Sequence, residues 1–231
     1  MEIKNLSLKF GEKVLYSNFN FQIENGKITC ILGKSGCGKT SLLNCIARQI
    51  DCQGEIVGAG KISFVFQTPR LIPRISIRKN LEFVIDSLSK DEKKRKVDSV
   101  AEQFECKEIL DKFPDQISGG EGARVAVARA FCSSSQTILL DEPFENIDIR
   151  LKSQIIEQLL FSIAQDKKTA LCVSHNVEDI LLMADRVVVF GGQPNEIVLD
   201  KQIAIPQNQR KFGDKQMASL REEIYSCLMS L

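Results

Sequence analysis

The sequence predicts an α/β fold in which helices cover both faces of a parallel sheet. Short apolar runs such as "TILL" and "VVVF" are typical of strands that are buried on both sides. Most of these strands alternate with stretches whose apolar residues have helical spacing. A chain of 231 residues is long enough for one such domain with a further segment inserted in it.

The order of the expected elements separates a helical insert from the α/β body. Strands are expected at residues 3–10, 17–23, 27–32, 54–57, 62–67, 137–143, 168–174 and 186–192, and helices at 41–50, 77–88, 93–104, 107–113, 150–165 and 176–184. The mixed charges of "SKDEKKRK" fit the solvated face of one of these helices.

Residues 1–231 are therefore expected to form a single domain. Its α/β core combines residues 1–68, which include an N-terminal β subdomain, with residues 135–200. A helical subdomain over residues 69–134 is inserted between them, and residues 201–231 form a short C-terminal tail whose helix packs on the body.

Composition narrows the class of function. A formal net charge of +1 gives no basis for binding nucleic acid through overall electrostatics. The eight cysteines form no C-x-x-C pair and the chain has one histidine, which argues against a zinc site and fits a reducing compartment. The N-terminus lacks the layout of a signal peptide, and no apolar stretch approaches the length of a membrane span.

The stretch "ILGKSGCGKTSLL" carries the clearest chemistry. Gly33-x-x-x-x-Gly38-Lys39-Thr40 is a Walker A pattern between an expected strand and an expected helix, which is where a phosphate-binding loop lies. A glycine-rich turn without a ligand is the plainer alternative. The predicted nucleotide contacts are Gly33, Lys34, Ser35, Gly36, Cys37, Gly38, Lys39, Thr40 and Ser41, with the Lys39 amine on the β- and γ-phosphates and the Thr40 hydroxyl on Mg²⁺.

A second stretch, "TILLDEPF", supplies two carboxylates. Asp141 and Glu142 follow a buried strand, at the sheet edge where α/β proteins bind ligands. We expect Asp141 to hold Mg²⁺ through water and Glu142 to act as the general base on the attacking water.

With these motifs in place, the chain resembles the ATP-binding-cassette (ABC) transporter ATPases over nearly its whole length. "ISGGE" resembles the signature motif of that family and begins a helix. The resemblance implies a P-loop NTPase fold with a RecA-like parallel core, an N-terminal antiparallel β subdomain and an inserted helical subdomain. It also implies ATP and Mg²⁺ as ligands. The signature residues Ser118, Gly119, Gly120 and Glu121 would close over ATP held by another subunit, in a head-to-tail homodimer or a pseudo-symmetric pair of cassettes.

Four further positions match the family's loops. The resemblance implies that Gln67 contacts magnesium and water and faces the permease, that Asp148 in "ENID" belongs to the D-loop, that His175 lies near the γ-phosphate, and that Phe10 stacks on adenine. The plainer alternatives are a surface glutamine, a helix N-cap, a lone polar histidine and a core phenylalanine.

Position 121 departs from the family, which usually has glutamine there. The carboxylate of Glu121 either faces the nucleotide and weakens closure, or faces the ribose or an arginine such as Arg124. "ENID" also lacks the small residues that are common in the D-loop.

The segment "TPRLIPRISIRKNLEF" resembles the importer subset that serves nitrate, sulfonate and taurine, although Arg74 stands where that subset has tryptophan. An importer ATPase is therefore expected on the inner face of the cell membrane. It would dock through Gln67 and the helical subdomain to a permease, and a solute-binding protein would deliver the solute to that permease. An exporter, a lipid- or lipoprotein-extracting complex or a cell-division cassette is the alternative, followed by a cassette with no membrane partner.

Overall fold

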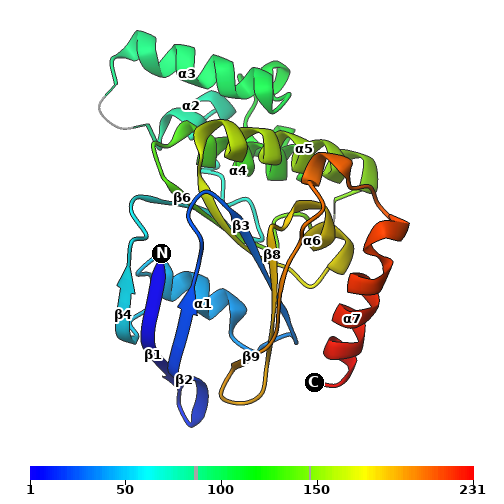
Figure 1. Ribbon diagram of the computed structural model, residues 1–231. Coiled ribbons are helices and arrows are strands. Elements are labelled where there is room, and N and C mark those ends of the chain that lie inside the picture. Colours follow the sequence, from blue (N-terminus) through cyan, green and yellow to red (C-terminus); the bar gives the residue numbers. More distant parts are fainter. Residues whose placement is uncertain (86–87, 146) are drawn as a thin grey trace. The chain divides into compact units, whose positions relative to one another are not determined.

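The computed structural model describes residues 1–85, 88–145 and 147–231 (Figure 1). Its contacts divide the chain into two compact units. The first unit comprises Met1–Gly60 and Lys167–Leu231, and the second comprises Lys61–Asp166. The bounds of the second unit are wider than the helical subdomain expected at residues 69–134, because this unit also contains two strands and a long helix.

An antiparallel sheet forms the N-terminal part of the first unit, with its strands in the order β2-β1-β4 (Figure 1). Their bounds are β1 (Glu2–Phe10), β2 (Lys13–Gln22) and β4 (Gln53–Val57). Side chains alternate between buried and exposed over the second half of β2, where Phe19 and Phe21 are buried, as is Ile23 just after it. Register shifts interrupt the alternation in β1. The single apolar face of these strands is what the alternation in the sequence predicts.

Four strands of a second sheet also lie in this unit, in the order β7-β3-β8-β9. These strands are β3 (Ile28–Gly33), β7 (Thr169–Val173), β8 (Arg186–Gly191) and β9 (Glu196–Gln202). The first three strands in that order run parallel, and every residue of β3 and β7 is buried. The predicted parallel core is confirmed here. The antiparallel strand β9 was not expected, because its polar residues give it only one half-buried face.

Three α-helices belong to the first unit: α1 (Lys39–Ile46), α6 (Val177–Met183) and α7 (Ala218–Met229). The last of these lies in the C-terminal tail. Cys30 and Cys172 are buried within β3 and β7, and the eight cysteines, all of them within the described residues, are free thiols.

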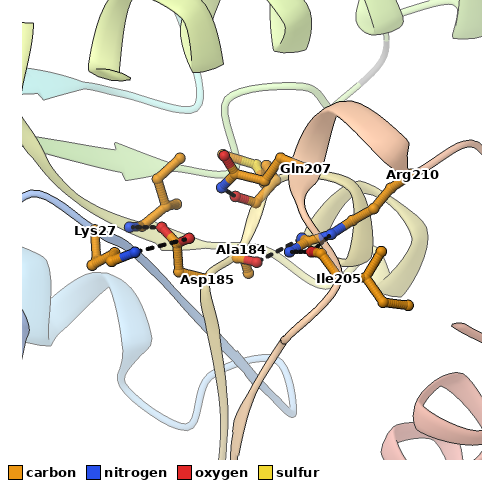
Figure 2. A network of polar contacts seen from close by, with 8 residues as sticks. Lys27, Ala184, Asp185, Ile205, Gln207 and Arg210 are labelled. Carbon is orange, nitrogen blue, oxygen red and sulfur yellow. Dashed lines mark hydrogen bonds and ion pairs between the residues drawn. The ribbon is translucent and has the colours of Figure 1, made fainter. Parts of the chain in front are cut away.

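A buried arginine of the C-terminal tail forms hydrogen bonds with the end of α6 (Figure 2). Arg210, 7% exposed, donates from its guanidinium to the carbonyl oxygens of Leu181 at 3.1 Å and Ala184 at 2.7 Å. It also binds the carbonyl of Ile205, and Gln207 donates to the carbonyl of Met183. The last carbonyls of a helix have no partner within the helix. The tail therefore supplies a cap that α6 lacks by itself.

A second contact holds the tail to the other end of α6. Arg221 of α7 forms a bidentate ion pair with Glu178 in the first turn of α6. Next to the Arg210 cap, Asp185 accepts a hydrogen bond from the backbone N–H of Ile28 at 2.8 Å and pairs with Lys27 at 3.9 Å (Figure 2).

The second unit combines a parallel strand pair with helices. The strands are β5 (Ile62–Val65) and β6 (Thr137–Asp141), and the helices are α2 (Ile77–Glu82), α3 (Lys90–Gln103), α4 (Gly119–Cys132) and α5 (Ile149–Asp166). α3 begins at a capping box in which Ser89 and Glu92 bind one another's backbone N–H groups. Most of its charged side chains are exposed, as expected for the "SKDEKKRK" run.

Two helical predictions in this unit were too long. Residues 107–113 form only a 3₁₀ turn at Lys107–Ile109, because the chain turns again to the 3₁₀ segment Pro114–Gln116. The helix expected at 77–88 ends at Glu82, and residues 86 and 87 lie outside the described part of the chain. Across the described ranges, we find no helix with the length and apolar character that a bilayer span requires.

Candidate functional site

The loop between β3 and α1 has the backbone of an anion-binding nest. Gly36 and Gly38 have φ angles of 72° and 111°, in the region that only glycine adopts readily. Gly38 is also the N-cap of α1, so the backbone N–H groups of the first helical turn lie at the same loop. Successive N–H groups turned in this way form a concave site for phosphate.

Lys39 is folded into this loop. Its side chain is 6% exposed, and its amine donates to the carbonyl oxygens of Gly33 at 2.7 Å and Lys34 at 3.0 Å. The predicted cation is thus held at the loop by neutral acceptors. A phosphate oxygen would be a stronger acceptor, because hydrogen bonds between charged groups are roughly twice as strong as neutral ones.

The other predicted loop residues differ in exposure. Those in the middle of the loop and just inside the helix are open or half-buried, namely Lys34, Ser35, Gly36, Cys37, Thr40 and Ser41. The Thr40 hydroxyl is on an exposed residue in the first turn of α1. It is an oxygen donor of the kind that Mg²⁺ prefers.

His175 leaves the sheet at the same edge as the loop. β3 and β7 are parallel neighbours with Ile31 opposite Val173, and the backbone N–H of Ser174 donates to the carbonyl of Ile31 at 3.2 Å. The chain therefore passes into the phosphate loop and into His175 from adjacent strand ends. The exposed His175 precedes Asn176, which caps α6 by accepting from the backbone N–H of Asp179.

Phe10 is not a core residue. It ends β1, directly opposite Lys13 across a tight turn, and 52% of it is exposed. An exposed aromatic ring at a hairpin tip is consistent with the predicted stacking on adenine and excludes the plainer alternative.

The two predicted carboxylates lie in the second unit, at the end of β6. Asp141 is 6% exposed, and Glu142 is half-buried. The backbone of Glu142 has φ 47°, a left-handed conformation that is uncommon for a residue with a side chain. Strained backbone of this kind concentrates at functional sites, which agrees with the role predicted for Glu142.

Gln67 emerges beside these carboxylates, because β5 and β6 are parallel and Val65 lies opposite Leu140. Its amide donates to the carboxylate of Glu145, which sequence reasoning did not single out. The Gln67 segment is also tied to α4, since Arg129 donates to the carbonyl oxygens of Pro69 at 2.9 Å and Arg70 at 3.0 Å.

The start of α4 gives Glu121 a partner that neither of the two expected alternatives named. Its carboxylate accepts hydrogen bonds from the backbone N–H of Ser118 at 2.7 Å and from the Ser118 hydroxyl at 2.8 Å. The same hydroxyl accepts from the backbone N–H of Glu121 at 3.2 Å. These hydrogen bonds lower the pKa of Glu121, the backbone N–H of Ser118 having the largest effect. The side chain is therefore part of a capping box, which the pattern Ser-x-x-Glu could have predicted.

Asp148 caps the next helix of the unit. Its carboxylate accepts from the backbone N–H of Leu151 at 3.0 Å, at the start of α5. Asp148 therefore acts as a helix N-cap, as the plainer alternative predicted, and its D-loop role stays a prediction. Asn146 of the same stretch lies outside the described residues. A Cβ atom at position 120 would lie 2.4 Å from Leu151 Cδ2, so a larger residue there would require the Leu151 side chain to move.

The structure thus brings the predicted residues together in two groups, one in each unit. The phosphate loop and His175 share one strand edge, while Gln67, Asp141 and Glu142 share another, with the Ser118 and Asp148 caps in the same unit as the latter. Within the described ranges, no cluster of three or more His, Cys, Asp or Glu side chains is placed to hold a metal.

Comparison with known proteins identifies relatives of this chain. Residues 16–145 match the sequence profile of the ABC transporter family. The aliphatic sulfonates import ATP-binding protein SsuB of Bacillus thuringiensis subsp. konkukian is 32% identical over 225 residues, which cover 93% of this chain and 89% of that protein. SsuB of Bacillus anthracis is 33% identical over 218 residues, covering 90% and 86%.

Two solved structures share the fold. The dimeric structure of MJ0796, a bacterial ABC transporter cassette, superposes with a TM-score of 0.77 at 26% identity, covering 89% of this chain and 99% of that one. A dimeric post-hydrolysis state of the same cassette, bound to ADP and Pi, gives a TM-score of 0.76 at 27% identity with the same coverage.

Proposed function

The chain belongs to the ABC transporter ATPases, and from this premise we propose that it powers an importer of small sulfonate-like solutes. As a member of this family it binds and hydrolyses ATP. The proposal adds the class of solute, the direction of transport, the partners and the role of each site residue.

The loop between β3 and α1 carries the nucleotide function. Its positive-φ glycines, the N-terminus of α1 and the amine of Lys39 together supply the N–H donors and the positive charge that bind a phosphate group. In this proposal Lys39 moves from the carbonyls of Gly33 and Lys34 to the β- and γ-phosphates of ATP, and the ring of Phe10 stacks on the adenine.

The roles of the remaining polar residues follow from their chemistry. Glu142 takes a proton from the attacking water, and His175 contacts the γ-phosphate. The oxygen donors Thr40, Asp141 and Gln67 fit Mg²⁺, which prefers oxygen ligands and would neutralise charge on the phosphates when bound. We assign the proton transfer to Glu142 because its carboxylate follows Asp141 directly at the end of β6, where α/β sheets bind their ligands.

A second copy of the chain, or a related cassette, completes the site in this proposal. The MJ0796 cassette, which has the same fold, is a dimer. A head-to-tail pair would place the Ser118-Gly119-Gly120 start of α4 against ATP held by the other subunit, where the helix N-terminus favours negative charge. Asp148 would contact the other subunit beside it.

The permease and the cellular location belong to the same proposal. The chain would lie on the cytoplasmic face of the membrane, docked to a separate permease near Gln67 and residues 69–134, with a solute-binding protein on the far side. Its relatives are named as aliphatic sulfonates import ATP-binding proteins, which supports the import of aliphatic sulfonates. They do not favour the exporter, extractor or cell-division alternatives.

Growth on a sulfonate tests the solute class. A strain of the source organism that lacks this chain should grow on sulfate but not with ethanesulfonate as its sole sulfur source. The wild-type chain and the exposed-lysine control Lys211→Ala should restore growth, whereas Lys39→Ala should not. Undiminished growth of the deletion strain on several aliphatic sulfonates would show that the solute class is wrong, even if the purified chain hydrolyses ATP.

A further inference from the structure

Three consecutive carbonyl groups of the phosphate loop are bound from outside the loop. The Lys13 amine donates to the carbonyl of Gly36 at 3.0 Å, and the Tyr16 hydroxyl donates to that of Gly38 at 3.0 Å. Between them, the side-chain amide of Asn195 donates to the carbonyl of Cys37. Two of these donors come from β2, and Asn195 comes from the turn between β8 and β9.

The planarity of the peptide bond gives these contacts a consequence for the loop. In a trans peptide the carbonyl of one residue and the N–H of the next point in opposite directions. Donors that hold the carbonyls of Cys37 and Gly38 on one side of the loop therefore hold the N–H groups of Gly38 and Lys39 on the other. At Gly38 the Tyr16 hydroxyl shares this role with the backbone N–H of Leu42, which donates to the same carbonyl at 2.9 Å. A phosphate-binding nest needs N–H groups fixed in this way.

Two of the donors are rigidly placed. Tyr16 is fully buried, and burial raises the pKa of its phenol, so the hydroxyl keeps its proton and remains a donor. Asn195 is 5% exposed, and both its side-chain amide and its backbone N–H bind the carbonyl of Leu15, at 3.1 and 2.8 Å. Lys13 is exposed, so its long side chain is held less firmly.

Gly38 fits closely between these residues. A Cβ atom at position 38 would lie 3.1 Å from Leu15 Cδ1, 3.3 Å from the Asn195 amide nitrogen and 3.4 Å from Tyr16 Cε2. The last glycine of the Walker A pattern is thus packed against Tyr16 and Asn195, which bind the loop carbonyls.

We propose that Tyr16 and Asn195 are positioning residues for the phosphates of the nucleotide, acting through the carbonyls of Gly38 and Cys37. The inference rests on the proposed function in one respect, which is that the anion in the loop belongs to ATP. Neither side chain touches the nucleotide; each holds backbone N–H groups in the orientation that binds it. The nest is therefore pre-organised by β2 and by the turn after β8, rather than by its own sequence alone.

The removal of one donor should weaken the binding of any ligand whose phosphates bind the N–H groups of the loop. ATP, ADP and inorganic tripolyphosphate should lose affinity by similar factors, because all three use the same N–H groups. These contacts are made in the ground state and in the transition state alike, so KM for ATP should rise while kcat changes little.

The test compares two conservative tyrosine variants of the full chain. Tyr16→Phe removes only the hydroxyl, and Tyr225→Phe is the matched control, because Tyr225 is a half-exposed residue of α7. Dissociation constants for ATP, ADP and tripolyphosphate are measured by calorimetry at fixed salt, and melting temperatures are measured without ligand. We expect Tyr16→Phe to weaken all three ligands by about three- to tenfold, the size of one hydrogen bond, and Tyr225→Phe to leave them unchanged.

Asn195→Ala is the second variant, so the result does not depend on the folding of Tyr16→Phe. It should weaken the same three ligands by a similar factor. If both variants melt at lower temperature but bind all three ligands like the wild type, the two residues are only structural and the inference is wrong. If the wild-type chain itself binds no ATP, the proposed function fails and the inference fails with it.

Discussion

Replacing Glu121 with glutamine removes one negative charge from the start of α4 while keeping the shape of the side chain. The carboxylate accepts two hydrogen bonds from Ser118, at 2.7 and 2.8 Å, and lies in the first helical turn, where negative charge is favourable. A neutral amide oxygen accepts the same bonds more weakly. Because Glu121 is only half-buried, we expect Glu121→Gln to lower the free energy of unfolding by only about 0.5 kcal/mol.

The same change should affect the proposed site in the opposite direction. In the structure the Ser118 hydroxyl donates a hydrogen bond to the Glu121 carboxylate. To donate to a γ-phosphate, it must break that bond, and an amide oxygen holds it less strongly than a carboxylate does. We therefore expect Glu121→Gln to tighten ATP-dependent pairing and to lower KM for ATP by about two- to fivefold, equivalent to roughly 0.5–1 kcal/mol.

The capping box of α3 provides a matched control. Glu92 accepts from the backbone N–H of Ser89 at 2.8 Å and from its hydroxyl at 2.6 Å, which is the same arrangement at a helix that carries no predicted site residue. Glu92→Gln should lower stability for the same reason but leave KM unchanged. Urea unfolding and steady-state ATPase rates at fixed salt measure both quantities. Equal KM values for the two variants would refute the competition between Glu121 and the phosphate for Ser118.

The effect of Glu121 on stability should also depend on pH. Hydrogen bonds from Ser118 lower the pKa of Glu121 below its ordinary value of 4.5, so the ionised form favours the folded chain. This contribution is present above the unfolded pKa and is lost as the pH falls through the lower folded pKa. The stability difference between wild type and Glu121→Gln should therefore shrink below about pH 4.

Three further predictions concern other residues. Glu142→Gln should keep ATP binding but stop hydrolysis, so that an ATP-dependent dimer accumulates in size-exclusion chromatography; continued hydrolysis would transfer the base role to His175. Arg210→Met should lower the free energy of unfolding by about 2–4 kcal/mol, because it leaves buried carbonyls at the end of α6 unpaired, and a loss below about 1 kcal/mol in urea unfolding would contradict the cap. Phe10→Ala should weaken ATP several-fold without affecting inorganic tripolyphosphate or the melting temperature, since its ring is exposed; equal weakening of both ligands would argue against stacking.

The parts of the site that depend on local sequence could be predicted. The phosphate loop requires glycines and a lysine at fixed spacing between a strand and a helix, and both the spacing and the elements are readable from the chain. The buried strands β3 and β7 were predictable for the same reason, because strands covered on both faces are continuous apolar runs.

The parts that depend on distant residues could not be predicted. Nothing near Arg210 in the sequence indicates that it caps α6, since its partners Leu181 and Ala184 are 29 and 26 residues earlier. The same holds for Asn195, which is distant in sequence from the loop carbonyl that it binds. The strand β9 was missed because its three apolar residues are consecutive and do not alternate with polar ones. Glu121 is a different case, because Ser-x-x-Glu is a local capping pattern that the comparison with the family's glutamine had obscured.

The bracing of the phosphate loop also has a consequence for how the protein is made. Ribosomal synthesis proceeds from the N-terminus, so the loop is synthesised early, yet Asn195 follows Cys37 by 158 residues. β3 itself has β7 and β8 as its neighbours, and both belong to the last third of the chain. A nascent chain that has not reached the turn after β8 therefore carries the complete Walker A sequence without a rigid nest. A chain interrupted before that turn would therefore bind ATP weakly, and the nucleotide would do little to stabilise it against unfolding.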